Sequence, residues 1–172
     1  MTCWISHCTG LVATDCLRRR RLVSQVPYLL SDKPPRIDGK RLELQFELRA
    51  PATFKIPDQP DGYGIRVSLY TDNRQSRFAF IDWNSITKNA EHVTIPGNVP
   101  LLTHSKSRSL LASIGNEPGA SQFIELKTLP AAPRKENETW SDWTLATQRA
   151  DLTPVPEPER IAVRYRVRSV DN

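Results

Sequence analysis

Cysteine is missing from almost the whole chain, because Cys3, Cys8 and Cys16 all lie within the first sixteen of its 172 residues. The rest of the chain has no disulfide to stabilise it and must rely on a hydrophobic core, which a chain of this length can form. An odd number of cysteines also excludes a set that is fully paired within one chain.

Long apolar runs and helical patterns are missing as well. No segment approaches the 18 or so apolar residues that a membrane-spanning helix needs, so we predict no transmembrane segment. No window of about eleven residues repeats its apolar positions every 3.6 residues. The 14 prolines of the chain further disfavour long helices.

The body of the chain lacks an excess of charge of either sign. The formal net charge is +5, but residues 1–40 hold seven Lys or Arg against three Asp or Glu, and the remaining residues hold seventeen against sixteen. Binding of nucleic acid requires clustered cations that displace counterions from phosphates. We therefore predict no nucleic-acid partner.

What the chain does contain is alternation of apolar and polar residues. Residues 160–170 alternate Ile, Val, Tyr and Val with Ala and three arginines, and residues 41–49 alternate Leu and Phe with Glu and Gln. Such a period of two predicts strands with one buried and one exposed face. We expect these two strands to pair, because the acidic outer face of the first would then lie beside the arginine outer face of the last.

Further strands are expected along the chain. Residues 63–70 and 77–83, separated by a short polar turn, have the pattern of a hairpin. Pro96-Gly97 is expected to end one short strand before another begins at Val99. Other strands are expected over residues 109–114 and 122–129. Residues 139–147 alternate less cleanly, and Trp140 and Trp143, three residues apart, indicate either a bulged strand or an aromatic pair within a loop. About eight or nine strands at this spacing indicate an all-β fold, an antiparallel β-sandwich.

We assign residues 37–172 to a single sandwich domain and residues 1–36 to an N-terminal arm, either a flexible, poorly ordered tail or an atypical targeting segment.

The N-terminal arm resembles neither an export signal nor a metal site. Its arginines follow its apolar stretch, whereas a secretory signal carries its positive charge first. The sequence is therefore compatible with the periplasm or the cytoplasm. Adjacent ligands such as His7 and Cys8 lack the paired short spacings typical of structural zinc sites. We expect no metal and no cofactor.

Candidate catalytic residues are few. Beyond the N-terminal arm the only histidines are His92 and His104, and no Gly-x-Ser-x-Gly or His-Glu-x-x-His motif is present. Asp82, beside Trp83 at the end of an expected strand, is the most suggestive acid. A small hydrolase that uses Asp82 and His104 is one alternative, and it would require the two side chains to share a cleft.

Aromatic and arginine side chains indicate binding instead. The tryptophans either cap the core or form a recognition platform, and the arginines of the last strand form an ion-paired face or a patch for an acidic partner. We expect a non-enzymatic protein that binds another protein, in general character similar to small bacterial inhibitor or immunity proteins that neutralise a toxin. The alternative is a carbohydrate-binding module with coplanar tryptophans. The expected binding surface includes the loop 51–62 and the residues Tyr63, Trp83, Trp140, Trp143, Arg164, Arg166 and Arg168.

Overall fold

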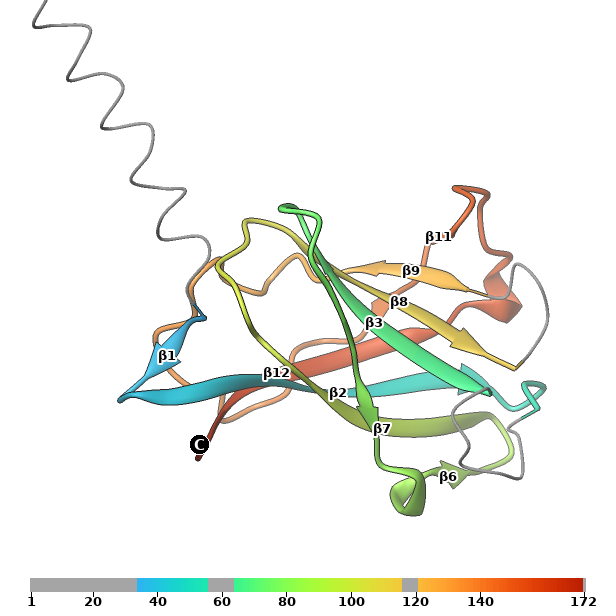
Figure 1. The fold of residues 1–172 in the computed structure, drawn as a ribbon. Coiled ribbons are helices and arrows are strands. Elements are labelled where there is room, and N and C mark those ends of the chain that lie inside the picture. The colour runs from blue at the N-terminus through green and yellow to red at the C-terminus, as the bar shows by residue number, and fades with distance from the viewer. Residues whose placement is uncertain (1–33, 56–63, 116–120, 172) are drawn as a thin grey trace, which may run out of the picture.

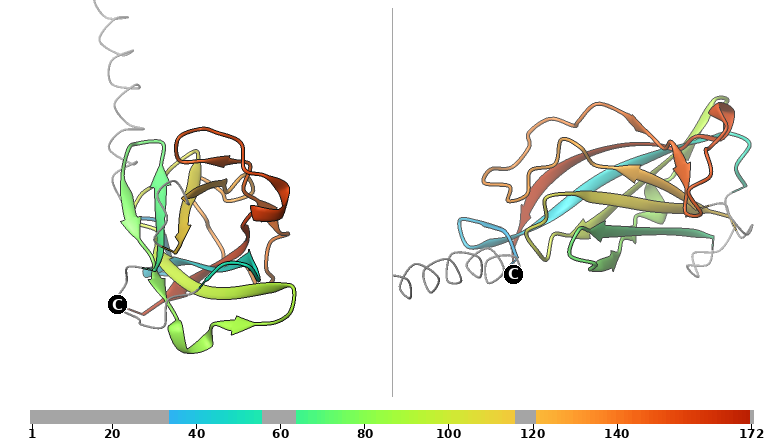
Figure 2. Two further views of the ribbon diagram at one scale, coloured as in Figure 1. Left: turned by 90° about the vertical axis from the view of Figure 1, so that its right-hand side faces the viewer. Right: turned by 90° about the horizontal axis from the view of Figure 1, so that it is seen from above.

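Two antiparallel sheets pack face to face in the computed structural model, which describes residues 34–55, 64–115 and 121–171 (Figures 1 and 2). The predicted all-β sandwich is confirmed. Most of the predicted N-terminal arm and the second half of the loop 51–62 lie outside the described residues. Neither of the two helical segments in the described part, each three residues long, could cross a lipid bilayer.

The larger sheet has seven strands in the order β10-β12-β2-β7-β5, with β1 pairing to β2 and β6 pairing to β7. Its members are β1 (Arg36–Ile37), β2 (Lys40–Pro51), β5 (Phe80–Ile81), β6 (Thr87–Lys88), β7 (His92–Pro100), β10 (Thr144–Leu145) and β12 (Ala162–Val170).

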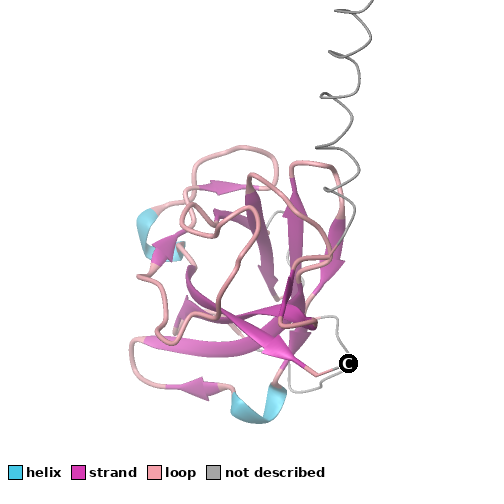
Figure 3. Cartoon of the chain, turned by 90° about the vertical axis from the view of Figure 1, so that its left-hand side faces the viewer, coloured by secondary structure: helices cyan, strands magenta, loops and turns pink. Residues whose placement is uncertain are grey.

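The smaller sheet has five strands in the order β11-β9-β8-β3-β4. It contains β3 (Ile65–Thr71), β4 (Ser76–Phe78), β8 (Arg108–Ile114), β9 (Gln122–Glu125) and β11 (Gln148–Arg149). Two single turns of 3₁₀ helix, η1 (Trp83–Ser85) and η2 (Glu157–Glu159), lie outside the sheets (Figure 3).

The predicted partnership of the first long strand with the last is confirmed. Strands β2 and β12 run antiparallel at the centre of the larger sheet, although more than a hundred residues separate them in sequence. Arg164 lies opposite Glu47, Arg166 opposite Gln45 and Arg168 opposite Glu43. The alternation therefore places the apolar faces of both strands on the core and their charged faces on the outside.

The core fills the space between the two sheets. Leu44, Phe46 and Leu48 of β2 and Val163 and Val167 of β12 are essentially inaccessible to solvent. The inner face of the smaller sheet contributes residues of the same kind, including Val67, Leu69, Leu110, Ala112, Ile114 and Ile124. Burial of these side chains supplies most of the free energy of folding in a protein without disulfides in its described part.

The described residues form twelve strands rather than eight or nine, because six of them are only two or three residues long. Short strands at sheet edges leave little alternation for sequence analysis to detect. Residues 139–147, expected as a bulged strand or an aromatic pair within a loop, are one of these cases, since only Thr144–Leu145 pairs with β12.

The expectation that Pro96-Gly97 ends a strand is wrong, because β7 runs without interruption through both residues. Every second residue of a strand directs its backbone N–H and C=O to the same neighbouring strand. The N–H of Leu101, just after β7, donates to the Leu42 carbonyl of β2 at 2.9 Å, so Gly97, four residues earlier, also directs its backbone groups toward β2. The nitrogen of Pro96 therefore faces the opposite side, where β5 ends before β6 begins. A missing N–H at that place costs the sheet no hydrogen bond.

Candidate functional site

Five side chains on the outer face of the larger sheet form a stacked series, which we term the Arg–Trp ladder. The guanidinium of Arg49 lies 4.1 Å from the ring centroid of Trp143, and that of Arg164 lies 4.9 Å from Trp143 and 5.1 Å from Trp140. The guanidinium of Arg166 lies 4.5 Å from the Trp140 ring. Each indole thus has two arginines as neighbours.

The spacing of a strand explains why the ladder assembles. Arg164 and Arg166 are two residues apart on β12, so their side chains leave the sheet about 7 Å apart. An aromatic ring inserted between two planar groups at van der Waals distance needs the same separation. Each cation–π contact contributes about 0.5–2 kcal/mol. The ladder therefore attaches the segment that contains Trp140 and Trp143 to the sheet. It also occupies the ring faces on which a sugar would stack.

The arginines of β12 also have polar partners. Arg164 Nε donates to Glu47 Oε2 at 2.7 Å, and Nη2 of the same guanidinium forms an ion pair with that oxygen at 2.5 Å. Arg166 Nε donates to Gln45 Oε1 at 3.0 Å, and Arg168 lies 3.3 Å from a carboxylate oxygen of Glu136. Of the two interpretations of these arginines, the geometry favours an ion-paired face.

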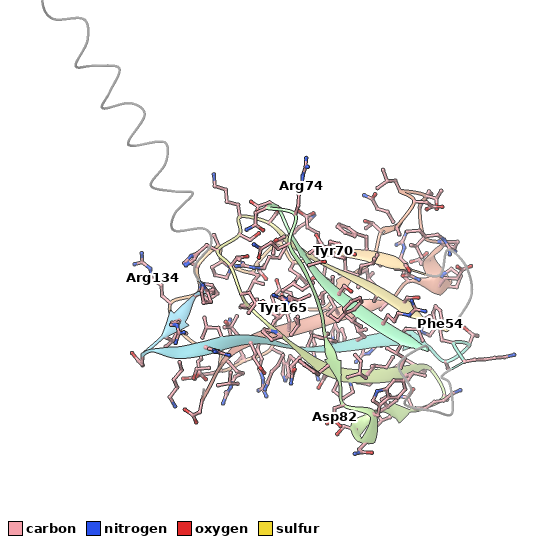
Figure 4. All side chains as sticks on the ribbon, in the orientation of Figure 1. Phe54, Tyr70, Arg74, Asp82, Arg134 and Tyr165 are labelled. Atoms are coloured by element: carbon pink, nitrogen blue, oxygen red, sulfur yellow. The ribbon has the colours of Figure 1, made fainter. Side chains whose placement is uncertain are left out.

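Residues 136–145 run along the outer edge of β12 and cover it. The backbone N–H of Asn137 donates to the Val167 carbonyl at 2.9 Å, and the N–H of Ser141 donates to the Tyr165 carbonyl at 2.8 Å. The Ser141 hydroxyl in turn accepts the Tyr165 N–H at 3.0 Å. These bonds satisfy backbone groups of β12 that an uncovered edge would leave open to a second chain. Tyr165, labelled in Figure 4, lies on the strand beneath them.

Glu136 fixes the far end of the same segment. Its carboxylate accepts hydrogen bonds from the hydroxyl and the backbone N–H of Ser169 and lies beside Arg168. The hydroxyl bond, the backbone bond and the positive charge of Arg168 lower the pKa of Glu136 below its ordinary value, against a smaller effect of desolvation. Glu136 therefore remains an anion to a lower pH than an ordinary glutamate does.

Beside the ladder, one row of cross-strand partners crosses four strands of the sheet. Arg166, Gln45, Asn98 and Phe80 stand side by side on β12, β2, β7 and β5. Phe80 is 69% exposed although it is a large apolar side chain. Within the described part of the chain, neither the amide of Asn98 nor the NH₂ group of Gln45 forms a hydrogen bond. This row thus combines an open aromatic ring with free donors and acceptors.

The neighbouring row adds two carboxylates. Arg164, Glu47 and Pro96 follow one another across the sheet, and the Asp82 N–H donates to the Pro96 carbonyl at 3.0 Å. A depression of about 340 Å³ lies over these rows. Its lining residues include Gln45, Glu47, Phe80, Asp82, Pro96, Asn98, Trp140 and Arg166. We term this depression, with the exposed ring of Phe80 at its side, the docking face.

The docking face has the geometry of a shallow, rigid recognition surface. Phe80 on β5 and the ladder above β12 lie three strand spacings apart, about 14 Å, with the two amides between them. The Asp82 carboxylate accepts a hydrogen bond from the Ser85 hydroxyl at 2.6 Å and is otherwise exposed. All of these positions except Trp140 and Asp82 lie on strands, so a ligand would meet groups that are already in place.

The structure brings together Trp140, Trp143, Arg164 and Arg166, and it places Arg168 next to them. Trp83 does not join this group, because it begins η1 and packs, partly buried, against the core. Tyr63 and residues 56–62 of the expected loop lie outside the described residues, as does the cysteine-rich start of the chain.

Asp82 and His104 do not line a common depression in the described structure. Asp82 lies beside the middle of β7. Ser105, the neighbour of His104, bonds to Asp72 in the β3–β4 turn through its hydroxyl at 2.5 Å. Figure 4 shows Arg74, which belongs to that same turn, at the top of the molecule and Asp82 at the bottom. Among the described residues no three His, Cys, Asp or Glu side chains gather closely enough to hold a metal ion.

Sequence reasoning missed Arg49, Gln45, Asn98 and Phe80. The alternation of residues 41–49 placed Arg49 on the outer face, but nothing in the sequence showed that its guanidinium would lie against Trp143. Phe80 gave no such signal, because residues 78–81 are apolar throughout and do not show which ring points outward.

Comparison of the chain with protein-family models, with curated proteins and with solved structures found no match.

Proposed function

We propose that this protein is a non-enzymatic module that binds another protein through the docking face, with a role of the inhibitor or immunity type directed at a bacterial toxin. The observation that carries the proposal is the exposed ring of Phe80 beside the unpartnered amides of Asn98 and Gln45. A large ring next to fixed hydrogen-bonding groups is the usual composition of an interface hot spot.

The energetic reason lies in what a partner would displace. Covering Phe80 removes apolar surface from water at a gain of about 25 cal/mol per Å². The amide groups supply hydrogen bonds that reject partners unable to match them, since a buried unpaired donor costs about 1–3 kcal/mol. Strands hold most of these groups rigidly, so little conformational entropy is lost on binding.

The ladder argues against the carbohydrate-binding alternative. A sugar stacks on an open aromatic face, but the faces of Trp140 and Trp143 are next to arginine side chains. Trp83 packs against the core. Phe80 is then the only ring of the docking face that a sugar could stack on, whereas a module of this kind needs two or three coplanar rings.

The test compares capture of partners by three forms of the protein from an extract of the native organism. Phe80→Ser removes the exposed ring. Leu152→Ser is the matched control, because Leu152 is 77% exposed but belongs to the turn after β11. We expect a protein that the wild type and the control recover equally and that Phe80→Ser recovers at least tenfold less.

Mass spectrometry of the captured material, together with a glycan array, distinguishes the outcomes. The same set of proteins recovered by all three forms would contradict docking through this face. Binding of a polysaccharide by the wild type, lost in Phe80→Ser, would instead establish the carbohydrate-binding alternative.

A further inference from the structure

The free edge of the smaller sheet is a second place where the chain is built to accept a partner. Strand β4 (Ser76–Phe78) is the last strand of this sheet, and all three of its residues are exposed. In Figure 1 it is the green strand that follows β3 after the hairpin at the top of the view.

The hydrogen-bond pattern shows which backbone groups of β4 are open. The Thr71 N–H donates to the Gln75 carbonyl at 3.0 Å, and the Ala79 N–H donates to the Val67 carbonyl at 2.8 Å. Antiparallel pairs alternate between bonded and non-bonded positions, so Arg77 also faces β3. Ser76 and Phe78 must then direct their N–H and C=O groups away from the sheet. Among the described residues, no hydrogen bond occupies these four groups.

The side chains of β4 divide by face. Phe78 is 76% exposed on the outer face, diagonal to Tyr70, which is 39% exposed (Figure 4). Arg77 points to the opposite face, because its cross-strand partner Leu69 belongs to the core. Arg77 is nevertheless exposed, and it lies on the strand at the edge of the sheet. Neither Arg77 nor Arg74 forms an ion pair within the described residues.

An inward-facing charge on an edge strand restricts what can pair with it. Antiparallel pairing of β4 with β4 of a second copy would bring Arg77 close to its own equivalent, and like charges across a strand pair are destabilising. A partner strand that carries a carboxylate at this position would instead form an ion pair. The edge is therefore selective for acidic occupants.

We infer that β4 accepts an extended segment of a partner protein as an added antiparallel strand. The segment carries an acidic side chain opposite Arg77 and apolar side chains opposite Ser76 and Phe78, so that it alternates apolar and acidic residues. This inference rests on the proposed role in protein binding and names the chemistry of the partner. Phe78 and Phe80 are two residues apart on one extended segment, so the added strand would lie next to the docking face.

The experiment titrates the isotope-labelled full chain with a seven-residue peptide of alternating valine and aspartate, and follows backbone amide signals by NMR. We expect saturable shifts centred on the amides of Ser76 and Phe78. A peptide with lysine in place of aspartate should bind about tenfold more weakly, because it replaces an attractive pair by a repulsive one.

Two variants test the mode of binding. Ser76→Pro removes an outward N–H that the sheet does not use, so it should leave the fold intact and abolish binding. Arg77→Glu should reverse the preference and favour the lysine peptide. Thermal unfolding of each variant shows whether it is folded. If Ser76→Pro does not fold, the binding preference of Arg77→Glu decides the result.

Several results would overturn the inference. These are failure of the aspartate peptide to bind at millimolar concentration, equal binding by Arg77→Glu, and shifts that map away from β4. Concentration-dependent self-association that Ser76→Pro abolishes would show that a second copy is the occupant. The peptide titration depends on β4, whereas the capture experiment depends on Phe80. Either experiment can therefore fail while the other succeeds, so failure of this inference can be told apart from failure of the proposed function.

Discussion

At the scale of single residues, Gly97 shows how closely a core side chain and a neighbouring strand approach the backbone of β7. It lies opposite Phe46, and a Cβ at this position would be 2.6 Å from Phe46 Cζ and 2.7 Å from the carbonyl oxygen of Phe80. The aromatic ring thus packs over the space that a side chain would occupy. The carbonyl belongs to β5, so the same glycine also sets how closely β5 approaches and where Phe80 projects.

Gly97→Ala should therefore destabilise the protein by about 2–3 kcal/mol, because both the ring and a backbone oxygen would have to move. Urea unfolding measures this effect. Gly39→Ala is the control: a Cβ there meets nothing within 4 Å, but the positive φ of +78° imposes a cost of about 1 kcal/mol. Equal losses in the two variants would contradict the close approach at Gly97.

The lowered pKa of Glu136 predicts a dependence of stability on pH. A carboxylate whose pKa is lower in the folded state stabilises that state above its ordinary pKa, which is 4.5 here. This contribution is lost as the pH falls through the folded-state pKa. The wild type should therefore be more stable than Glu136→Gln at neutral pH, and the difference should disappear in strong acid. Chemical unfolding at a series of pH values tests this, and a constant difference would contradict the role of the charge.

At the scale of elements, residues 136–145 act as a cover for the edge of β12 rather than as a strand. Only Thr144–Leu145 of this segment pairs as β10, and the remainder is fixed by single hydrogen bonds and by the Arg–Trp ladder. Of the two expectations for residues 139–147, a bulged strand or an aromatic pair within a loop, the structure shows the second, because Trp140 and Trp143 lie outside β10. Tryptophans three residues apart cannot alternate across a sheet, but they can lie between arginines of the neighbouring strand.

Trp140→Ala should loosen this cover. It removes one ring from between two guanidinium groups, and we expect a loss of about 2 kcal/mol together with increased light scattering, since the β12 edge becomes accessible. Leu145→Ala is the control from the same segment, because Leu145 is largely exposed. Its stability should stay within about 0.5 kcal/mol of the wild type. A similar effect of both substitutions would mean that the ladder does not hold the segment.

At the scale of the whole molecule, the sandwich depends on contacts between the two ends of the described chain. Strand β12 pairs with β2 along its whole length and contributes Val163, Tyr165 and Val167 to the core. Arg164 and its partner Glu47 are 117 residues apart in sequence. A topology with such distant pairings folds slowly, because loop closure precedes most of the stabilising contacts.

Removal of residues 161–172 should therefore prevent folding rather than merely reduce stability. Without β12 the β2 strand becomes an edge, and apolar side chains of the core lose their neighbours. Near-ultraviolet circular dichroism and urea titration should show no cooperative transition. A folded, cooperatively unfolding fragment would mean that the remaining strands form a core without β12.

The alternation of residues 41–49 and 160–170 by itself determined which side chains face the core and which strand could pair with which, since a period of two fixes faces and complementary charges fix partners. The tertiary structure alone decided what those outward side chains meet. The arginines of β12 could have faced solvent, but residues 136–145 placed two tryptophans between them. Phe78 and Phe80 could have been core residues, but β4 and β5 lie at the edges of two different sheets, where no layer covers them. A local pattern specifies direction, whereas exposure depends on segments from elsewhere in the chain.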